Sequence, residues 1–95
     1  MKLVWTRTAK NDLQNIIAYY SKLNPVAASD LIGVIIAAAM QLEDFPELGR
    51  NAETGKVRLW QVPGRAYVLP YRIVDNEVEI LAVFDQRQKR PDGWV

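Results

Sequence analysis

The sequence predicts an α+β fold in which a helical hairpin packs on one face of a mainly antiparallel four-stranded sheet. Two observations support this prediction. Apolar residues recur at helical spacing over residues 8–43, whereas residues 57–84 form β-type runs separated by turn residues. A short strand-like run precedes the helices, so the expected order is β-α-α-β-β-β. No repeat, linker or low-complexity segment interrupts the chain, which indicates a single domain over residues 1–95.

Residues 1–6 predict a short half-buried strand, because Leu3 and Trp5 alternate with residues that face the other side. After this strand, Thr8 is expected to cap a helix. The first turn of that helix would hold Asp12, a favourable charge at the positive end of the helix dipole. The apolar residues at the spacing of one buried helical face are Leu13, Ile16, Ile17 and Tyr20.

A second helix is expected to follow almost at once. Asn24 suits the N-cap position and Pro25 suits the first helical position. The helix should run to about Glu43, since the pair Phe45 and Pro46 ends it. Because the connection is so short, the two helices should pack as an antiparallel hairpin.

This second helix is more apolar than packing on one sheet requires, because residues 31–40 contain no polar side chain. The stripe expected to face the sheet consists of Ala27, Leu31, Val34, Ile35, Ala38 and Leu42. The apolar residues outside that stripe are Ile32, Ile36, Ala39 and Met40. The apolar run is shorter than the roughly 20 residues that cross a bilayer, so no membrane partner is expected. Two interpretations remain: the helix is enclosed within its own domain, or its outer face docks a partner chain.

The remaining strands are separated by recognisable turns. A polar loop over residues 47–55 leads to a strand over residues 57–62. Residues 62–65 fit a type II turn, because proline presets φ and glycine accepts a positive φ. The next strand covers residues 66–74.

The last two strands should form a hairpin. Asp75 and Asn76 both tolerate the left-handed region, which favours a tight turn before a strand over residues 77–84. Pro70 cannot donate a ladder hydrogen bond. Its nitrogen is therefore expected at a sheet edge or opposite a bulge.

The composition excludes several kinds of site. The chain has neither cysteine nor histidine, so disulfides, the common zinc sites and Ser/His catalysis are excluded. The acidic residues show no spacing typical of an oxygen-ligand metal loop, so neither a metal nor a cofactor is expected. The N-terminus lacks the apolar region of a signal peptide, which favours the cytoplasm. The net charge of +1 is far from the basic footprint of a duplex-DNA binder.

Cationic side chains gather near the C-terminus. Arg87, Lys89 and Arg90 follow the last predicted strand, where they suit a phosphate or an acidic protein surface. Arg65 lies in the predicted turn, where a solvated charge is the ordinary interpretation. Arg72 lies within a strand and has a structural alternative, an ion pair across the hairpin with Glu77 or Glu79.

These features together resemble the RelE/ParE superfamily of toxins from bacterial toxin–antitoxin modules. The matching segments are residues 5–9 with Asp12, Leu13 and Ile16, then 24–28, 45–50, 67–72 and 78–83, with Arg87 and Pro91 after them. The resemblance implies a type II toxin that a cognate antitoxin silences in a hetero-oligomer, and that reaches operator DNA only through this antitoxin. An amphipathic antitoxin helix, with an added strand, is expected to cover Ile32, Ile36 and Met40.

The superfamily implies two activities. RelE-like members resemble ribosome-dependent mRNA endonucleases, for which Arg65, Arg72, Arg87 and Lys89 are the candidate catalytic residues. ParE-like members poison DNA gyrase, and the target-binding residues would then be Arg65, Arg87, Lys89 and Arg90.

The residues near the C-terminus favour the ParE-like branch. Nucleases of the superfamily often have a histidine after the last strand and a tyrosine in the tail, and this chain has Asp85 and Trp94 there. A carboxylate is a poor proton donor near neutral pH unless its pKa is strongly raised. A gyrase inhibitor is therefore favoured, with an mRNA endonuclease or a degenerate non-toxic member as alternatives, so whether the chain is an enzyme stays open.

Overall fold

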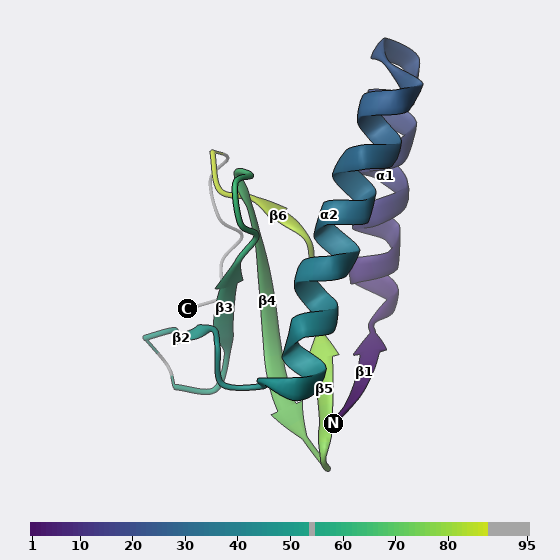
Figure 1. The fold of residues 1–95 in the computed structure, drawn as a ribbon. Coiled ribbons are helices and arrows are strands. Elements are labelled where there is room, and N and C mark those ends of the chain that lie inside the picture. The colour runs from purple at the N-terminus through teal and green to yellow at the C-terminus, as the bar shows by residue number, and fades with distance from the viewer. Residues whose placement is uncertain (54, 88–95) are drawn as a thin grey trace.

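In the computed structural model, which describes residues 1–53 and 55–87, two antiparallel helices pack on a mixed sheet (Figure 1). The elements are β1 (Lys2–Trp5), α1 (Arg7–Leu23), α2 (Pro25–Asp44), β2 (Arg50–Asn51), β3 (Arg58–Gln61), β4 (Tyr67–Val74), β5 (Glu77–Ile80) and β6 (Phe84–Asp85). The strand order is β1-β5-β4-β3-β2, and β6 also pairs with β4. Only the pair of β1 and β5 is parallel. The predicted α+β class and mainly antiparallel sheet are confirmed.

The described part of the chain contains six strands, so the prediction of four was wrong. One addition is β2, which pairs Arg50 with Leu59 inside the segment predicted to be a polar loop. A strand of two exposed residues leaves no alternation for a sequence pattern to detect. The other addition is β6, which arises because the strand predicted over residues 77–84 is interrupted.

The interruption is a bulge opposite Pro70. Tyr71 pairs with Ile80, and Val68 pairs with Phe84. The two residues on β4 are three positions apart, whereas their partners are four apart, so the partner segment contains one extra residue. The carbonyl oxygen of Pro70 accepts a hydrogen bond from the N–H of Leu81 at 2.8 Å, so proline's missing donor faces this same irregular segment. The prediction that Pro70 lies opposite a bulge is confirmed.

The first helix begins two residues earlier than its predicted cap. Thr6, and not Thr8, is the N-cap, since its Oγ1 accepts a hydrogen bond from the N–H of Ala9 at 3.3 Å. The same hydroxyl donates to the carbonyl oxygen of Ile80 at 2.8 Å, which ties the helix start to the end of β5. Because α1 starts at Arg7, Asp12 lies in the second turn and is not placed to act on the helix dipole.

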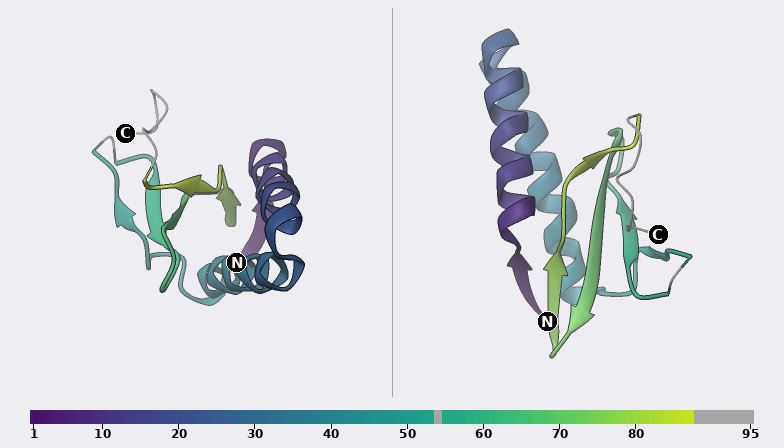
Figure 2. Two further views of the ribbon diagram at one scale, coloured as in Figure 1. Left: turned by 90° about the horizontal axis from the view of Figure 1, so that it is seen from above. Right: turned by 180° about the vertical axis from the view of Figure 1, so that it is seen from behind.

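The second helix and the hairpin follow the prediction. The Oδ1 of Asn24 accepts a hydrogen bond from the N–H of Ala27 at 3.1 Å, and Pro25 is the first helical residue. The N–H of Asn24 also donates to the carbonyl oxygen of Tyr20, so one residue ends α1 and starts α2. This connection forces the helices to run antiparallel, and Figure 2 shows that their joined ends extend beyond the sheet.

The sheet-facing stripe of α2 is largely as predicted, with three differences at Ala27, Ala28 and Ala39, and with Val34 only half-buried against the core. The buried residues of α2 are Ala28, Leu31, Ile35, Ala38, Ala39 and Leu42. Ala27, expected to face inward, is exposed because it lies in the first turn beside the projecting end of the hairpin. Ala39, expected outside the stripe, is fully buried in the core cluster that also contains Ala9 of α1. On α1, Ile17 is exposed although it was expected on the buried face.

The tight turns adopt the expected backbone conformations. Gly64 has a φ of +73°, and the N–H of Arg65 donates to the carbonyl oxygen of Val62 at 3.2 Å, as in a type II turn. Asp75 and Asn76 have φ values of +51° and +65°, which fits the predicted hairpin turn.

By length and composition α2 is also apolar enough to cross a membrane. In the structure its buried side chains pack on the sheet, and the indole Nε1 of Trp60 donates to the carbonyl oxygen of Ala38 at 2.9 Å. These contacts are those of a core helix in a globular protein.

Candidate functional site

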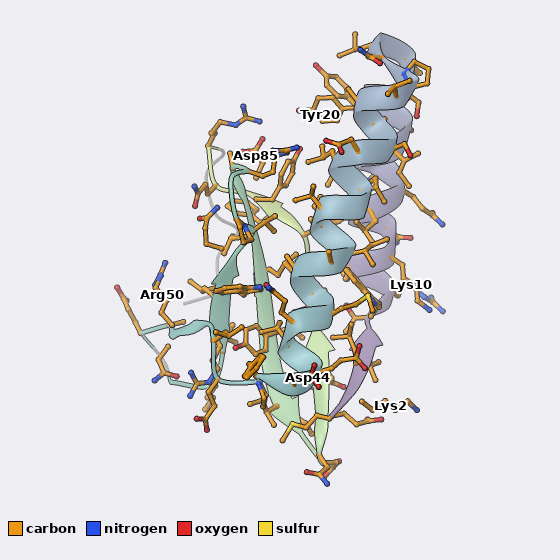
Figure 3. The ribbon with its side chains drawn as sticks, viewed as in Figure 1. Lys2, Lys10, Tyr20, Asp44, Arg50 and Asp85 are labelled. Carbon is orange, nitrogen blue, oxygen red and sulfur yellow. The ribbon has the colours of Figure 1, made fainter. Side chains whose placement is uncertain are left out.

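Two adjoining hollows lie between the helical hairpin and the end of the sheet where β4 starts and β6 ends. The first, of about 480 Å³, is lined by Asp12, Asn15, Ile16, Tyr19, Tyr20, Tyr67, Val83, Asp85 and Arg87. The second, of about 360 Å³, is lined by Tyr20, Ala27, Asp30, Leu31, Gly64, Arg65, Ala66, Tyr67 and Arg87. Tyr20, Tyr67 and Arg87 line both hollows, which we call together the rim groove. Figure 3 shows Tyr20 and Asp85 at this end of the molecule.

Arg87 is held by Asp85 in the rim groove. Its Nε and Nη2 donate to the two carboxylate oxygens of Asp85 at 2.9 and 2.6 Å, and its backbone N–H donates to Oδ1 at 2.9 Å. Hydrogen bonding from Arg87 lowers the pKa of Asp85, so this carboxyl is ionised near neutral pH. The predicted cationic rim is therefore neutralised at Arg87 by the chain's own carboxylate.

Two tyrosines stand beside this ion pair. Burial, together with hydrogen bonding to Tyr20, raises the pKa of Tyr67, so its phenol keeps its proton. Hydrogen bonding to Asp85, and then to Tyr20, raises the pKa of Arg87. The ring of Tyr20 meets that of Tyr19 edge to face, with centroids 4.9 Å apart. The groove thus offers the protonated phenol of Tyr67 and a permanently charged guanidinium.

Arg65 reaches the second hollow and is also paired. Its Nη2 lies 3.0 Å from Oδ2 of Asp30 on α2. Arg65 is an exposed loop residue, as the solvated-charge interpretation expects, and α2 adds a carboxylate partner 35 residues away in sequence. The exposed ion pair itself adds little stability.

The structure does not bring Arg72 to the rim groove. Its Nε donates to Oε1 of Glu79 at 2.6 Å, and the two residues are register partners on β4 and β5. The structural alternative, an ion pair across the hairpin, is confirmed. Arg72 lies toward the far end of β4 from Tyr67, which begins the strand at the groove.

The other predicted target-binding cations, Lys89 and Arg90, lie outside the described residues, as does Trp94. Tyr20, Asp12 and Asp30 were not predicted as members of the site. Tyr20 carried only the signal of a buried helical face, and the two aspartates carried none that distinguishes them from solvated charges. They reach the groove because α1 and α2 pass over the end of the sheet.

The predicted antitoxin-binding residues occupy successive turns of α2. Ile36 and Met40 are 39% and 53% exposed, whereas Ile32 is half-buried and packs against the core. The exposed pair Ile36 and Met40, called here the outer patch, lies on the side of α2 that the sheet does not cover. Among the described residues, Tyr19, Leu23 and Val26 at the hairpin end are also exposed apolar side chains.

The groove is poorly equipped for acid–base catalysis. Asp85 is ionised by its contact with Arg87, so it cannot supply the proton that a leaving oxygen needs. Among residues 1–53 and 55–87, no three acidic side chains are grouped to hold a metal ion. The arrangement is suited to binding, through an arginine fork, phenols and carboxylates.

Asp12 links α1 to the bulge before β6. Its Oδ2 accepts a hydrogen bond from the N–H of Val83 at 2.9 Å. Burial raises the pKa of Asp12, and the bond from Val83 opposes that shift. The residue thus holds the segment that carries Asp85 and Arg87 against the helical hairpin.

We expect Asp12→Asn to change how stability depends on pH. Because the native pKa of Asp12 is above its unfolded value of about 4, the folded protein binds this proton more tightly. Ionising Asp12 therefore costs stability as the pH rises from about 4 through the native pKa. Urea unfolding over that range should show the wild type losing stability relative to Asp12→Asn. Parallel stability curves would contradict the expectation.

Asp12→Ala is the companion variant. It removes the oxygen that the N–H of Val83 donates to, which Asn retains. Leaving that partly buried donor unpaired should lower the free energy of unfolding by about 1–2 kcal/mol relative to Asp12→Asn at every pH. The two variants separate the charge of Asp12 from its hydrogen bond.

Comparisons with known proteins identify relatives of the whole chain. The family model described as the ParE toxin of the type II toxin-antitoxin system parDE matches residues 3–90. The candidate toxin Y4kP of Sinorhizobium fredii is 33% identical over 90 residues, which cover 95% of this chain and 93% of that protein. Toxin RelE2 of Caulobacter vibrioides is 34% identical over 82 residues, covering 86% and 91%. A solved structure of the chromosomal ParDE system from P. aeruginosa matches with a TM-score of 0.81 and 28% identity, covering 90% of this chain and 95% of that one.

Proposed function

The chain belongs to the ParE toxin family and is the toxin of a type II toxin–antitoxin module, and we propose that it stops growth by binding and inhibiting DNA gyrase. The observation that supports this most is that the Asp85 carboxyl in the rim groove is ionised. Asp85 is bound by Arg87 and is not a proton donor, so the groove is suited to protein binding more than to RNA cleavage. Arg65 and Arg87, with Lys89 and Arg90 beyond the described residues, would contact the target.

The antitoxin of this module would cover the outer patch of Ile36 and Met40. Exposed apolar residues spaced four apart on a helix fit the apolar face of an amphipathic helix. The antitoxin would hold the toxin silent in a cytoplasmic hetero-oligomer, and the toxin would reach operator DNA only through the antitoxin.

Induced expression without antitoxin, followed by pulse labelling of DNA and protein synthesis, tests the target. Gyrase inhibition predicts an early collapse of DNA synthesis with an SOS response. An immediate block of translation with cut mRNA would contradict it and favour the endonuclease. Normal growth would indicate a non-toxic member of the family.

The endonuclease is the second candidate because the groove joins an arginine to two tyrosine hydroxyls. Tyr20, Tyr67 and Arg87 line both hollows, and such groups can contact and stabilise a phosphate. Cleavage of mRNA on purified ribosomes is the direct assay for this activity.

We expect Arg87→Ala to relieve toxicity under either mechanism. The substitution removes the only described cation shared by the two hollows, so survival on induction should rise by at least about tenfold. Arg72→Ala is the matched control, since it also breaks one exposed arginine–carboxylate pair but lies outside the groove. Equal survival of the two variants would contradict a role for the groove.

A further inference from the structure

Asp85 binds one edge of the Arg87 guanidinium, through Nε and Nη2, in the free protein. Three donors of Arg87 converge on this one carboxylate, at 2.6 to 2.9 Å. Planar, bidentate geometry of this kind is how arginine recognises a carboxylate from another chain. The internal pair therefore occupies the arrangement that an external anion would need.

The pair is accessible enough to be exchanged. The Arg87 side chain is 64% exposed and lines both hollows, so a ligand in either one reaches it. The Asp85 side chain is only 15% exposed and binds the guanidinium through both oxygens, so an incoming carboxylate must match this bidentate geometry from the open side of Arg87 to replace it. In the second hollow Arg65 is paired through a single contact, between its Nη2 and Oδ2 of Asp30 at 3.0 Å.

The charge of the groove favours a carboxylate over a nucleic-acid strand. Three aspartates, Asp12, Asp30 and Asp85, line the hollows with two arginines. A strand of closely spaced phosphates would meet all three negative charges. A single acidic side chain can take the place of Asp85 at Arg87 without adding a second charge to the fork.

We propose that Arg87 is a binding site for an acidic side chain of a partner protein, and that Asp85 is the built-in competitor this side chain must displace. The free toxin then presents a neutralised surface, and its guanidinium is released from Asp85 only by a ligand that supplies a replacement carboxylate. The identity of the partner rests on the proposed function, whereas the exchange can be measured on the purified protein alone.

The exchange is tested by titrating the purified full-length chain with an acetylated, amidated hexapeptide that carries one glutamate among neutral polar residues, observed by NMR. Asp85→Asn, which keeps an oxygen for the backbone N–H of Arg87, should bind the peptide about three- to fivefold more tightly than the wild type. Arg87→Ala should lose the binding. The matched control is Asp75→Asn in the β4–β5 turn, which should bind as the wild type does. Unchanged affinity of Asp85→Asn would overturn the proposal.

Two further measurements keep the proposal testable if Asp85→Asn folds poorly. In the wild type the peptide should shift the Nε resonance of Arg87, and a peptide that binds without moving this resonance overturns the proposal. A single-stranded RNA of six nucleotides, titrated in parallel, should bind more weakly than the peptide. Tighter binding of the RNA overturns the choice of a protein carboxylate. A chain that exchanges carboxylates without affecting DNA synthesis would disprove the gyrase proposal alone.

Discussion

Replacing Gly49 with alanine should lower the free energy of unfolding by about 2–3 kcal/mol. A Cβ at this position would lie 2.6 Å from Cε1 and 2.8 Å from the hydroxyl of Tyr71, and 3.0 Å from the carbonyl oxygen of Leu59. Tyr71 is fully buried and Leu59 contributes backbone, so neither can move without disturbing the sheet. Urea denaturation of the purified variant measures the effect.

The site is sensitive because Tyr71 fastens the segment after α2 to the centre of the sheet. Its hydroxyl donates to the carbonyl oxygen of Pro46 at 2.7 Å and accepts from the N–H of Gly49 at 2.9 Å. Burial raises the pKa of Tyr71, so the phenol keeps the proton it donates. A displaced ring would lose both bonds and leave the buried N–H of Gly49 without a partner.

Gly33→Ala is the control for this prediction. A Cβ at Gly33 meets nothing within 4 Å, and the residue lies inside α2, where alanine is the better helix former. This variant should be about 0.5–1 kcal/mol more stable than the wild type. If Gly49→Ala unfolds within 0.5 kcal/mol of the wild type, the contact with Tyr71 does not constrain the loop.

The helices and turns were predictable because their signals are local. Asn24 and Pro25 act within one helical turn, and Asp75 and Asn76 need only their own backbone angles. The irregularity beside Pro70 was predictable because proline has no N–H to donate, which places its nitrogen at a sheet edge or opposite a bulge. The N-cap was missed because Thr6 and Thr8 are both plausible caps. What distinguishes Thr6 is its bond to Ile80, 74 residues away.

The groove was only half predictable. Arg65 and Arg87 were predicted to lie at the sheet rim because each follows a predicted strand or turn in the sequence. Their neutralisation depends on where other elements pass. Asp30 reaches Arg65 from α2 only because the hairpin lies against the β3–β4 turn. Asp85 and Arg87 are two residues apart, and side chains at i and i+2 share one face of an extended strand, so the spacing permits the pair but does not reveal that the backbone N–H of Arg87 binds the same carboxylate. The pair forms because β6 ends at Asp85 and the chain turns there.

The apolar excess of α2 had two interpretations, and the structure supports a part of each. Ala39 is enclosed by α1, so that side of the helix belongs to the domain's own core. Ile36 and Met40 remain outside it and are not covered by any described element. An exposed apolar pair in the middle of this helix is a feature that a partner chain would cover.

Replacing Met40 with glutamate should weaken antitoxin binding by at least about 100-fold, because it removes apolar contact and places an unpaired charge in the covered surface. The fold should tolerate the change, since Met40 is 53% exposed. The rim groove is near the hairpin end of α2 and Met40 is near its other end, so target binding should be preserved. The expected phenotype is a toxin that the antitoxin no longer neutralises.

Isothermal titration with the cognate antitoxin measures the affinity, and co-expression in bacteria measures the neutralisation. Val26→Glu is the matched control, because Val26 is 80% exposed on the same helix but lies at the hairpin end, away from the outer patch. It should bind the antitoxin within a few-fold of the wild-type affinity. If Met40→Glu is neutralised as well as the wild type while Val26→Glu escapes, the antitoxin covers the hairpin end and the outer patch is not its binding surface.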